Sequence, residues 1–368
     1  MINMVDLFCG AGGFTEGFKK SGDFLHAFAN DVDPQAIQTF AFNHPEIQAI
    51  CKDITSFENA EITELTSGKR VDLIVGGPPC QGFSIAGQRI ANDPKNELFI
   101  DYMRVVSVLR PKFIIFENVV GLKSMQGGKV LDAIIVNLHD LGFETSFKVM
   151  NTADYGVPQA RPRLIIIARS DGGDLSFPQP THMKIAKDNP TLNFGEIVKN
   201  YVTVDDAFSG LPKILQGEGE EEILSTMEPQ NDFIRRVMGT RTNGKIFNHR
   251  ATKHSDKIIE RYNNMAQGSD GSSLPERLKT KKTNFFRLKS DEPSRTVTCN
   301  FRTDLIHPTY PRGLTVREAA RLQSFEDDYC FFGNLTRKAK YVTQDDQVGN
   351  AVPPIFAKAL ADHLKEIW

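Results

Sequence analysis

The first 170 residues of this chain alternate short apolar runs with helical stretches, and this alternation restricts the fold more than any other feature. Five apolar runs have the length of buried strands, at residues 5–8, 26–31, 71–75, 113–116 and 164–168. Between them, Leu98, Tyr102, Val105 and Leu109 recur at helical spacing. Strands that alternate with helices form a parallel sheet with crossover helices. We therefore predict an α/β fold.

The alternation ends near residue 172, where glycines and prolines interrupt it. The following stretch, to about residue 310, has few periodic elements, whereas residues 356–367 are again typical of a core helix. We predict a first domain at 1–174, a second, smaller domain at 175–330, and a return to the first domain at 331–368.

Composition excludes several classes of protein. Of the 368 residues, 40% are hydrophobic and 24% are charged, values typical of a folded chain rather than a disordered one. No apolar run approaches the roughly 18 residues that a membrane helix needs, and the N-terminus lacks the basic region of a signal peptide. The five cysteines include no C-x-x-C pair, which argues against a disulfide framework and a zinc site. We expect a protein of the cytosol or the nucleus, with no membrane association and no metal.

Charge is distributed unevenly, although the net charge is only −2. Residues 235–321 contain 19 Lys or Arg against 8 Asp or Glu, so the rest of the chain is acidic. A basic segment in an acidic protein is typical of nucleic-acid binding. A solvated basic surface is the alternative.

A glycine-rich turn follows the first predicted strand, with the sequence FCGAGGF at residues 8–14. Glycines allow a sharp turn and a close approach of the backbone to a ligand at the carboxyl end of a strand. The dinucleotide fingerprint G-x-G-x-x-G would require a glycine at position 15, where this chain has Thr15. The turn therefore favours an adenosine cofactor without a pyrophosphate over NAD, and a tight turn without a ligand is the alternative.

An acidic residue, Asp31, ends the second predicted strand, where a carboxylate can accept hydrogen bonds from ribose hydroxyls. The alternative for an acid at this place is a helix N-cap, and Asp33, which precedes a proline, suits that role better. We expect Asp31 to bind ligand and Asp33 to cap the helix.

Two further strand ends carry reactive side chains. Cys80 lies in a loop stiffened by two prolines, a setting that suits an aimed nucleophile, although free cysteines are more often buried apolar residues. Glu117 directly follows an apolar strand. Partial burial raises the pKa of such a carboxyl, so that it can hold or donate a proton near neutral pH. A capping role is the alternative for Glu117.

Six segments occur in order along the chain: DLFCGAGGF (6–14), GPPCQ (77–81), ENV (117–119), QARPR (159–163), REAARLQSF (317–325) and QVGNAVPP (347–354). Together they resemble the DNA cytosine-5 methyltransferases of prokaryotic restriction-modification systems. The resemblance spans nearly the whole chain except about residues 175–295. Two positions depart from it: Asp31 stands where the family more often has Glu, and Asn96 stands where Arg is common.

The resemblance implies a Rossmann-like S-adenosylmethionine-dependent methyltransferase sheet with a second, DNA-recognition domain. Residues 1–174 would bind the cofactor and carry catalysis, residues 175–330 would form the target-recognition domain and hinge, and residues 331–368 would return to the catalytic domain. The activity implied is methylation of carbon 5 of a flipped-out cytosine in a specific double-stranded DNA sequence.

The resemblance also implies a role for particular residues. Cys80 would attack carbon 6 of the base, Glu117 would hydrogen-bond or protonate N3, and Arg161 and Arg163 would contact the base and orient the acid. The S-adenosyl-L-methionine contacts implied are Phe8, Gly10, Ala11, Gly12, Gly13, Asp31, Val32, Asp53, Ile54, Gly77, Pro79, Leu98, Asn350, Ala351 and Val352.

The expected partner is double-stranded DNA, gripped at its phosphates by groups such as Lys279, Lys281, Lys282 and Arg287. A separate cognate restriction endonuclease is a further expected partner, and we expect a monomer. An RNA methyltransferase is the nearest alternative, but the tRNA-acting relatives carry a Cys-Phe-Thr tripeptide that this chain lacks. A regulatory relative without activity would lack the nucleophile or the acid, and both are present.

Overall fold

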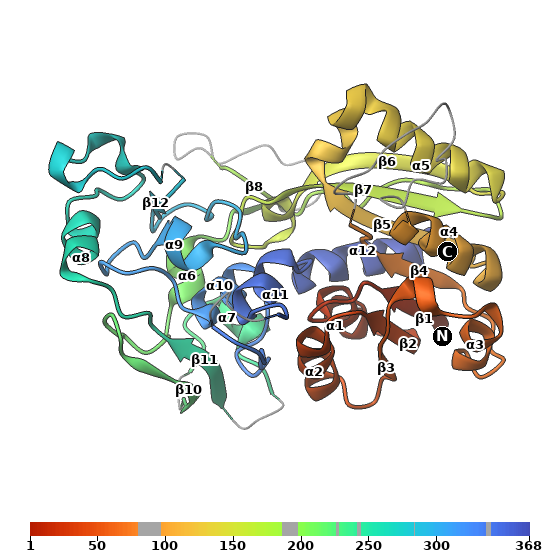
Figure 1. Ribbon diagram of the computed structural model, residues 1–368, viewed down its shortest axis with the longest axis horizontal. Coiled ribbons are helices and arrows are strands. Elements are labelled where there is room, and N and C mark those ends of the chain that lie inside the picture. Colours follow the sequence, from red (N-terminus) through yellow and green to blue (C-terminus); the bar gives the residue numbers. More distant parts are fainter. Residues whose placement is uncertain (80–96, 186–197, 226–227, 241–243, 283, 336–339) are drawn as a thin grey trace. The chain divides into compact units, whose positions relative to one another are not determined.

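The computed structural model describes residues 1–79, 97–185, 198–225, 228–240, 244–282, 284–335 and 340–368 (Figure 1). The chain forms two compact units. The first unit comprises Met1–Asn151, Pro162–Gln179 and Phe356–Trp368, and the second comprises Thr152–Arg161 and Pro180–Ile355.

These boundaries differ from the expected domains at 1–174, 175–330 and 331–368. The second unit is about as long as the first, and it also contains residues 152–161 and 331–355. The early segment belongs there because it is bonded to residues far along the chain: the Ala160 amide donates to the Ser294 carbonyl at 2.8 Å, and Thr296 Oγ1 donates to the Ala160 carbonyl at 2.9 Å. The QARPR motif is therefore divided between the two units after Arg161.

The first unit is built on a seven-stranded sheet with the order β3-β2-β1-β4-β5-β7-β6 (Figure 1). Its strands are β1 (Ile2–Leu7), β2 (Phe24–Asp31), β3 (Ala49–Cys51), β4 (Leu73–Gly76), β5 (Phe113–Val119), β6 (Glu144–Asn151) and β7 (Pro162–Arg169). β1 to β5 pair in parallel, whereas β7 runs antiparallel to both β5 and β6. The expected Rossmann-like sheet is confirmed, with one strand reversed.

Helices cover both faces of this sheet. They are α1 (Gly13–Ser21), α2 (Pro34–Asn43), α3 (Asn59–Leu65), α4 (Glu97–Leu109), α5 (Lys129–Asp140) and α12 (Pro354–Glu366), with the 3-10 turns η1 (Ile54–Ser56) and η3 (Val120–Gly128). Ile114 and Phe116 of β5 join a core cluster with residues of α3, α4 and α5. Successive strand residues point to opposite faces, and Phe113 packs on the other side against Trp368, with ring centroids 5.3 Å apart. The α4 helix follows the predicted spacing.

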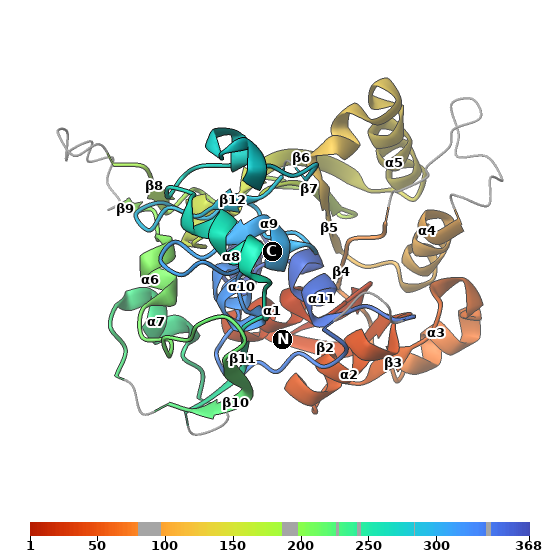
Figure 2. The ribbon, with the colours of Figure 1, turned by 60° about the vertical axis from the view of Figure 1, so that its left-hand side comes forward.

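In the residues that the structure describes, the second unit consists of short elements and two-stranded sheets (Figure 2). Its helices are η4 (Thr152–Tyr155), α6 (Val204–Phe208), α7 (Asp232–Val237), α8 (Asp256–Asn263), η5 (Gly271–Ser273), η6 (Glu276–Leu278), α9 (Phe301–Asp304), α10 (Val316–Leu322) and α11 (Gln344–Asn350). Its paired strands are β8 (His182–Met183) with β9 (Lys199–Asn200), β10 (Gly219–Leu224) with β11 (Lys245–Arg250), and β12 (Phe286–Arg287) with β13 (Leu305–Ile306). Across the described parts of both units, no helix is long and apolar enough to cross a membrane.

Buried arginines hold the centre of the second unit. Arg312 donates to both carboxylate oxygens of Glu318 at 2.8 and 2.7 Å, and Arg321 does the same with Asp327 at 2.7 and 2.6 Å. Arg317 of α10 donates to the Phe247 carbonyl at 2.8 Å. Each of these arginines is at most 1% exposed. A part of the basic excess at 235–321 is therefore internal, which reduces the charge available for a phosphate partner.

Loss of one of these arginines should destabilise the protein strongly. Arg321→Ala leaves the carboxylate of Asp327 buried without its partner, and breaking a buried ion pair costs about 3–5 kcal/mol. The control is Lys245→Ala, which removes an exposed ion pair with Glu222 and should cost about 1 kcal/mol or less. Urea unfolding of both variants measures the difference, and equal midpoints would show that the buried pair contributes no more than a surface one.

Candidate active site

The glycine-rich turn after β1 is fixed to the end of β2 by Asp31. One carboxylate oxygen of Asp31 accepts a hydrogen bond from the Gly10 amide at 2.9 Å, and the other accepts from the Asp33 amide at 2.9 Å. Gly10 and Gly12 have φ angles of 52° and 86°, the left-handed region that favours glycine. Asp33 caps α2 by accepting from the amides of residues 35 and 36, so the expected capping role is confirmed.

A second carboxyl, Asp6, lies beside the same turn and was not identified from the sequence. Thr15 Oγ1 donates to Asp6 Oδ2 at 2.7 Å. The other oxygen, Oδ1, is buried and has no hydrogen-bond partner among the described residues. Burial raises the pKa of Asp6 to about 7, although the bonds from Thr15 act in the opposite direction. Thr15 therefore replaces the fingerprint glycine with a hydroxyl that positions an acid, and the unpartnered oxygen fits a cationic ligand. The sequence signal that could have identified Asp6 is an acidic residue near the end of a strand that leads into a glycine turn.

Other expected cofactor contacts also lie in the first unit. Phe8 and Leu98 are partly buried and pack against the core, and the side chain of Val32 is 62% exposed beside Asp31. Asp53 caps η1 through Oδ1, which accepts from the Thr55 amide at 3.0 Å. Burial raises the pKa of Asp31. Phe8 and Val32 directly follow β1 and β2, so these two residues lie at the carboxyl ends of those strands.

Two of the expected contacts, Ala11 and Ile54, are each 2% exposed, and Ile54 belongs to the core cluster beneath α4. Ile54 is therefore used for packing in this structure. Gly13, by contrast, begins α1, as expected for a glycine turn that leads into a helix.

The loop that leads to Cys80 begins against Glu117. A Cβ atom on Gly77 would lie 2.8 Å from the Glu117 carbonyl oxygen and 3.2 Å from Glu117 Oε2, so only glycine fits there. Asn118 Nδ2 donates to the Pro78 carbonyl at 3.0 Å, and Pro79 is exposed. Cys80 itself lies outside the described residues. The backbone shortly before Cys80 therefore lies against Glu117. The resemblance gives Cys80 and Glu117 roles in the same reaction.

Arg163 of β7 forms an ion pair with Glu117, with Nε 2.8 Å from Oε1 and both side chains 13% exposed. The antiparallel pairing of β5 with β7 brings the two together, since Val119 lies opposite Arg163. The sequence indicated a partly desolvated acid after an apolar strand, and the structure adds a guanidinium that fixes its orientation.

Arg161 takes a different position. It lies in the second unit, is 1% exposed, and donates through Nη1 and Nη2 to the carbonyls of Val297 and Gly349, both at 2.8 Å. Its neighbour Gln159 donates to Gln323 Oε1 at 2.8 Å and accepts from the Val297 amide at 2.7 Å. We expected Arg161 to contact the base. In this structure its carbonyl contacts join distant segments of the second unit, and its contact with the base stays a prediction.

Asn350 is the last residue of α11, and Ala351 and Val352 follow that helix in the second unit. Gln323 Nε2 donates to the carbonyls of Val348 and Ala351 at 2.6 and 3.2 Å, and the Cys299 thiol lies 3.0 Å from Asn350 Oδ1. The two C-terminal motifs are therefore joined to each other. Their contact with the cofactor stays a prediction.

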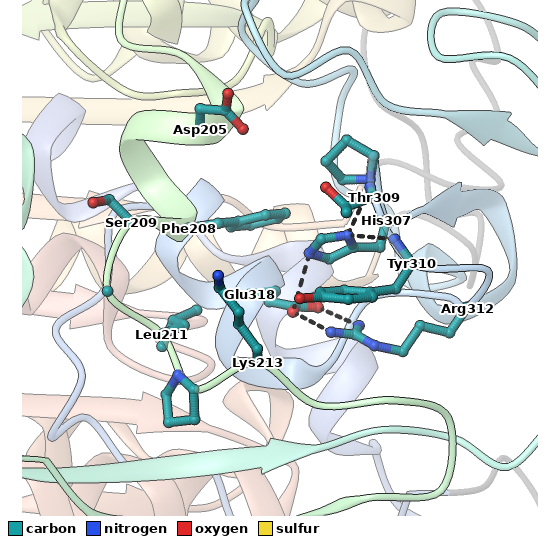
Figure 3. A pocket seen from close by; sticks show the side chains of 13 residues that line it. Asp205, Phe208, Ser209, Leu211, Lys213, His307, Thr309, Tyr310, Arg312 and Glu318 are labelled. Atoms are coloured by element: carbon teal, nitrogen blue, oxygen red, sulfur yellow. Dashed lines mark hydrogen bonds and ion pairs between the residues drawn. The ribbon is translucent and has the colours of Figure 1, made fainter.

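A cavity of about 300 Å³ in the second unit is lined by aromatic and charged side chains (Figure 3). Phe208 stacks on His307 with ring centroids 5.3 Å apart, and His307 Nδ1 accepts from the amides of Thr309 and Tyr310 at 3.0 and 3.1 Å. Burial lowers the pKa of His307 to about 4. Burial alone would raise the pKa of Glu318, but Arg312 and nearby histidines hold it well below its usual range. These groups partner one another, which is typical of a structural cluster.

Comparison with known proteins defines the class of enzyme. The model of the C-5 cytosine-specific DNA methylases matches residues 2–366. Type II methyltransferase M1.HphI of Haemophilus parahaemolyticus is 36% identical over 98% of this chain and 86% of its own length. Type II methyltransferase M.DdeI of Desulfomicrobium norvegicum is 35% identical over 99% of this chain and 88% of its own length. The chain belongs to the family of C-5 cytosine-specific DNA methylases.

Solved structures agree with this assignment. A DNA modification methyltransferase encoded within an E. coli prophage has a TM-score of 0.77 and 27% identity, and the match covers 100% of this chain and 99% of that one. The Dnmt2 methyltransferase of S. pombe has a TM-score of 0.62 at 16% identity over 100% and 99% of the two chains, which shows the same fold. The resemblance inferred from the six motifs is confirmed, and the protein is a DNA methyltransferase rather than an NAD-dependent oxidoreductase.

Proposed function

We propose that this methyltransferase transfers a methyl group from S-adenosylmethionine to carbon 5 of a cytosine flipped out of a specific double-stranded DNA sequence, through a covalent bond between Cys80 and carbon 6. The observation that carries the proposal is Glu117, which is paired with Arg163 and contacts the start of the Cys80 loop. The type II names of the relatives support a role in restriction and modification, with a separate endonuclease.

The chemistry follows from the low reactivity of carbon 5 in cytosine. The thiolate of Cys80 adds to carbon 6, and the electron pair moves toward N3, where the carboxyl of Glu117 hydrogen-bonds or protonates the ring. Carbon 5 then has enamine character and can accept a methyl group. Loss of the carbon 5 proton restores the double bond and expels Cys80.

Arg163 and the loop start position these groups. The guanidinium fixes one oxygen of Glu117, and Gly77 allows the backbone before Cys80 to approach the same carboxyl. A base must leave the DNA stack to reach such a site, since its target atoms are inaccessible within a duplex. The proposed setting is a cytoplasmic enzyme that acts on DNA as a monomer.

The residues around the glycine turn fit S-adenosylmethionine, which when bound supplies a methyl group on a sulfonium. Asp6 offers the buried, unpartnered oxygen to a cationic group, and Asp31 lies where ribose hydroxyls bind in comparable sheets. Phe8, Val32 and Leu98 provide apolar surface for the adenine.

Removal of Asp31 should weaken cofactor binding. Asp31→Ala deletes the acceptor for the Gly10 amide and the proposed ribose ligand, so we expect the dissociation constant for S-adenosylmethionine to rise roughly 10–100-fold. Asp33→Ala is the matched control, because it removes only the cap of α2 and should reduce stability by about 1 kcal/mol. Calorimetric titration of both variants is the measurement. Equal affinities would exclude Asp31 as a ligand.

Cofactor affinity should depend on pH through Asp6. Below its pKa of about 7 the carboxyl is protonated, and binding of a cation beside it must release that proton. Affinity should therefore rise with pH until about 7 and then level off. Because the folded pKa lies above the unfolded one, the same group should lower the stability of the free protein as pH rises from about 4 to about 7. Titration of Asp6→Asn should show neither dependence, and a wild-type affinity independent of pH would contradict this role.

Bisulfite sequencing tests the activity directly. DNA from cells that express the protein should contain 5-methylcytosine at one short sequence context, and DNA from cells that express Cys80→Ser should not. Methylation of cytosine N4 or of adenine in place of carbon 5 would refute the proposed reaction.

A further inference from the structure

A second cavity, of about 550 Å³, lies within the second unit. Its wall is formed by α7, by His182 of β8 and Lys199 of β9, and by residues 200–203 and 206. The charged side chains in this wall are Lys199, Arg235, Arg236, Asp206 and Asp232. This cavity belongs to the region that the sequence resemblance does not cover.

The acidic groups of the wall are already engaged. Asp232 forms an ion pair with Arg235 one turn along α7. Asp206 Oδ2 accepts from the Thr203 amide at 2.9 Å and from Thr203 Oγ1 at 2.8 Å, which closes the capping box of α6. Neither carboxylate is therefore available to neutralise a further cation fully.

Two cations remain, Lys199 and Arg236. Both are exposed, and neither has an ion pair or side-chain hydrogen bond among the residues that the structure describes. Both act on the same neighbour, His182, whose pKa is lowered to about 4 by burial and then by the charges of Arg236 and Lys199. Both cations and His182 line this same cavity.

His182 is a tightly packed part of the cavity wall. It is 5% exposed, its Nδ1 lies 2.8 Å from Thr181 Oγ1, and a Cβ on Gly156 would lie 2.7 Å from its ring. A tightly packed, neutral ring adds no positive charge at pH 7, so Lys199 and Arg236 carry the attraction for an anion.

We infer that this cavity binds a phosphodiester group of the DNA backbone, with Lys199 and Arg236 as the contacting cations. The inference rests on the proposed function, since it assigns a contact to the DNA substrate. A guanidinium and an ammonium in one concave site suit a phosphate, and phosphate contacts position DNA without reading its sequence.

Three of the four cations first expected to grip phosphates are less available, and the fourth, Lys281, is exposed but is not part of the wall of this cavity. Lys279 pairs with Glu276 at 2.9 Å, and Lys282 pairs with Asp304 at 2.5 Å. Arg287 donates to the carbonyls of Tyr262 and Met265, both at 2.8 Å, and to two others. Arg287 therefore holds its own loop together, and Lys199 and Arg236 are the stronger candidates.

The test compares a double variant, Lys199→Gln with Arg236→Gln, against Arg235→Gln. The control removes a charge from the adjacent position of α7, but that charge already has a carboxylate partner. Duplex binding is measured over a range of salt concentrations with the full chain. Each lost phosphate contact should lower the slope of log affinity against log salt by about 0.9 and weaken binding roughly tenfold at 0.1 M salt. Arg235→Gln should change both much less.

The preferred DNA sequence and the affinity for S-adenosylmethionine should stay at wild-type values, which also shows that the double variant is folded. A salt slope equal to that of wild type would overturn the inference. Binding of inorganic phosphate, measured by calorimetry, distinguishes a second outcome. If the double variant lost phosphate binding but kept the wild-type salt slope for DNA, the cavity would bind free phosphate and the inference would be overturned. Absence of cytosine methylation by the wild-type protein would instead overturn the proposed function.

Discussion

Replacement of Cys80 by serine should abolish methyl transfer, with a rate lower by roughly 10⁴-fold or more. A serine hydroxyl is a far weaker nucleophile than a thiolate near neutral pH. Cofactor affinity should not change, because the glycine turn and Asp31 do not depend on the thiol. Transfer of tritium from labelled S-adenosylmethionine to DNA measures the rate.

Cys330→Ser is the matched control for this prediction. Cys330 is a half-buried cysteine of the second unit that forms no disulfide, and burial raises its pKa to about 11, so its thiol is protonated at neutral pH. That variant should keep the wild-type rate. Turnover by Cys80→Ser at a rate near that of Cys330→Ser would remove the covalent mechanism.

Glu117→Gln should have the second largest effect, a fall in kcat of roughly 10²–10⁴-fold, the usual contribution of general acid–base catalysis. Glutamine keeps the size of the side chain and can still accept a hydrogen bond from Arg163 Nε, so the variant removes the proton and the charge with little change in shape. Binding of S-adenosylmethionine should be unaffected. Single-turnover kinetics with excess enzyme isolates this step from DNA binding.

A suitable control is Glu144→Gln, on the exposed start of the edge strand β6. It makes the same chemical change in the same unit and should leave the rate unaltered. If Glu117→Gln also kept the wild-type rate, the contact of Glu117 with the start of the Cys80 loop would not contribute to catalysis.

The sequence predicted the strand ends well because their signals are local. A glycine turn, an aspartate before a proline and an acid after an apolar run each depend on a few neighbouring residues. Asp31 ends β2 and Asp33 caps α2 as expected, whereas Glu117, expected directly after its strand, lies within β5, two residues before the strand ends. The confirmed family assignment has the same basis, because six motifs occur in order.

Strand direction and edge strands could not be predicted in this way. The apolar run at 164–168 has the same periodicity whether it runs parallel or antiparallel, and only its pairing with β5 and β6 decides. The edge strand β6 was missed because most of its residues are exposed or half-buried, so it lacks a continuous apolar run. β3, with three residues, is too short to show a pattern.

Arginine roles were also beyond a reading of the sequence. Arg161 and Arg163 are two residues apart in one motif, yet one is buried among carbonyls of the second unit and the other pairs with Glu117 in the first. Likewise, Arg312 and Arg321 belong to the basic segment, but both form ion pairs with buried carboxylates. Contacts between distant segments determine such roles, and counting charges along the sequence does not reveal those contacts.

The central claim, attack by Cys80 on carbon 6 of a DNA cytosine, is tested most directly by covalent trapping. Plasmid DNA amplified with 5-fluorocytosine carries the analogue at every possible target, so the recognised sequence need not be known. Fluorine on carbon 5 cannot leave as a proton does, and the enzyme should therefore stay bound to the base after methyl transfer. We predict an adduct that survives denaturing detergent, forms only with S-adenosylmethionine present, and maps to Cys80 by peptide mass. Methylation of ordinary DNA without any such adduct, or an adduct that persists in Cys80→Ser, would contradict it.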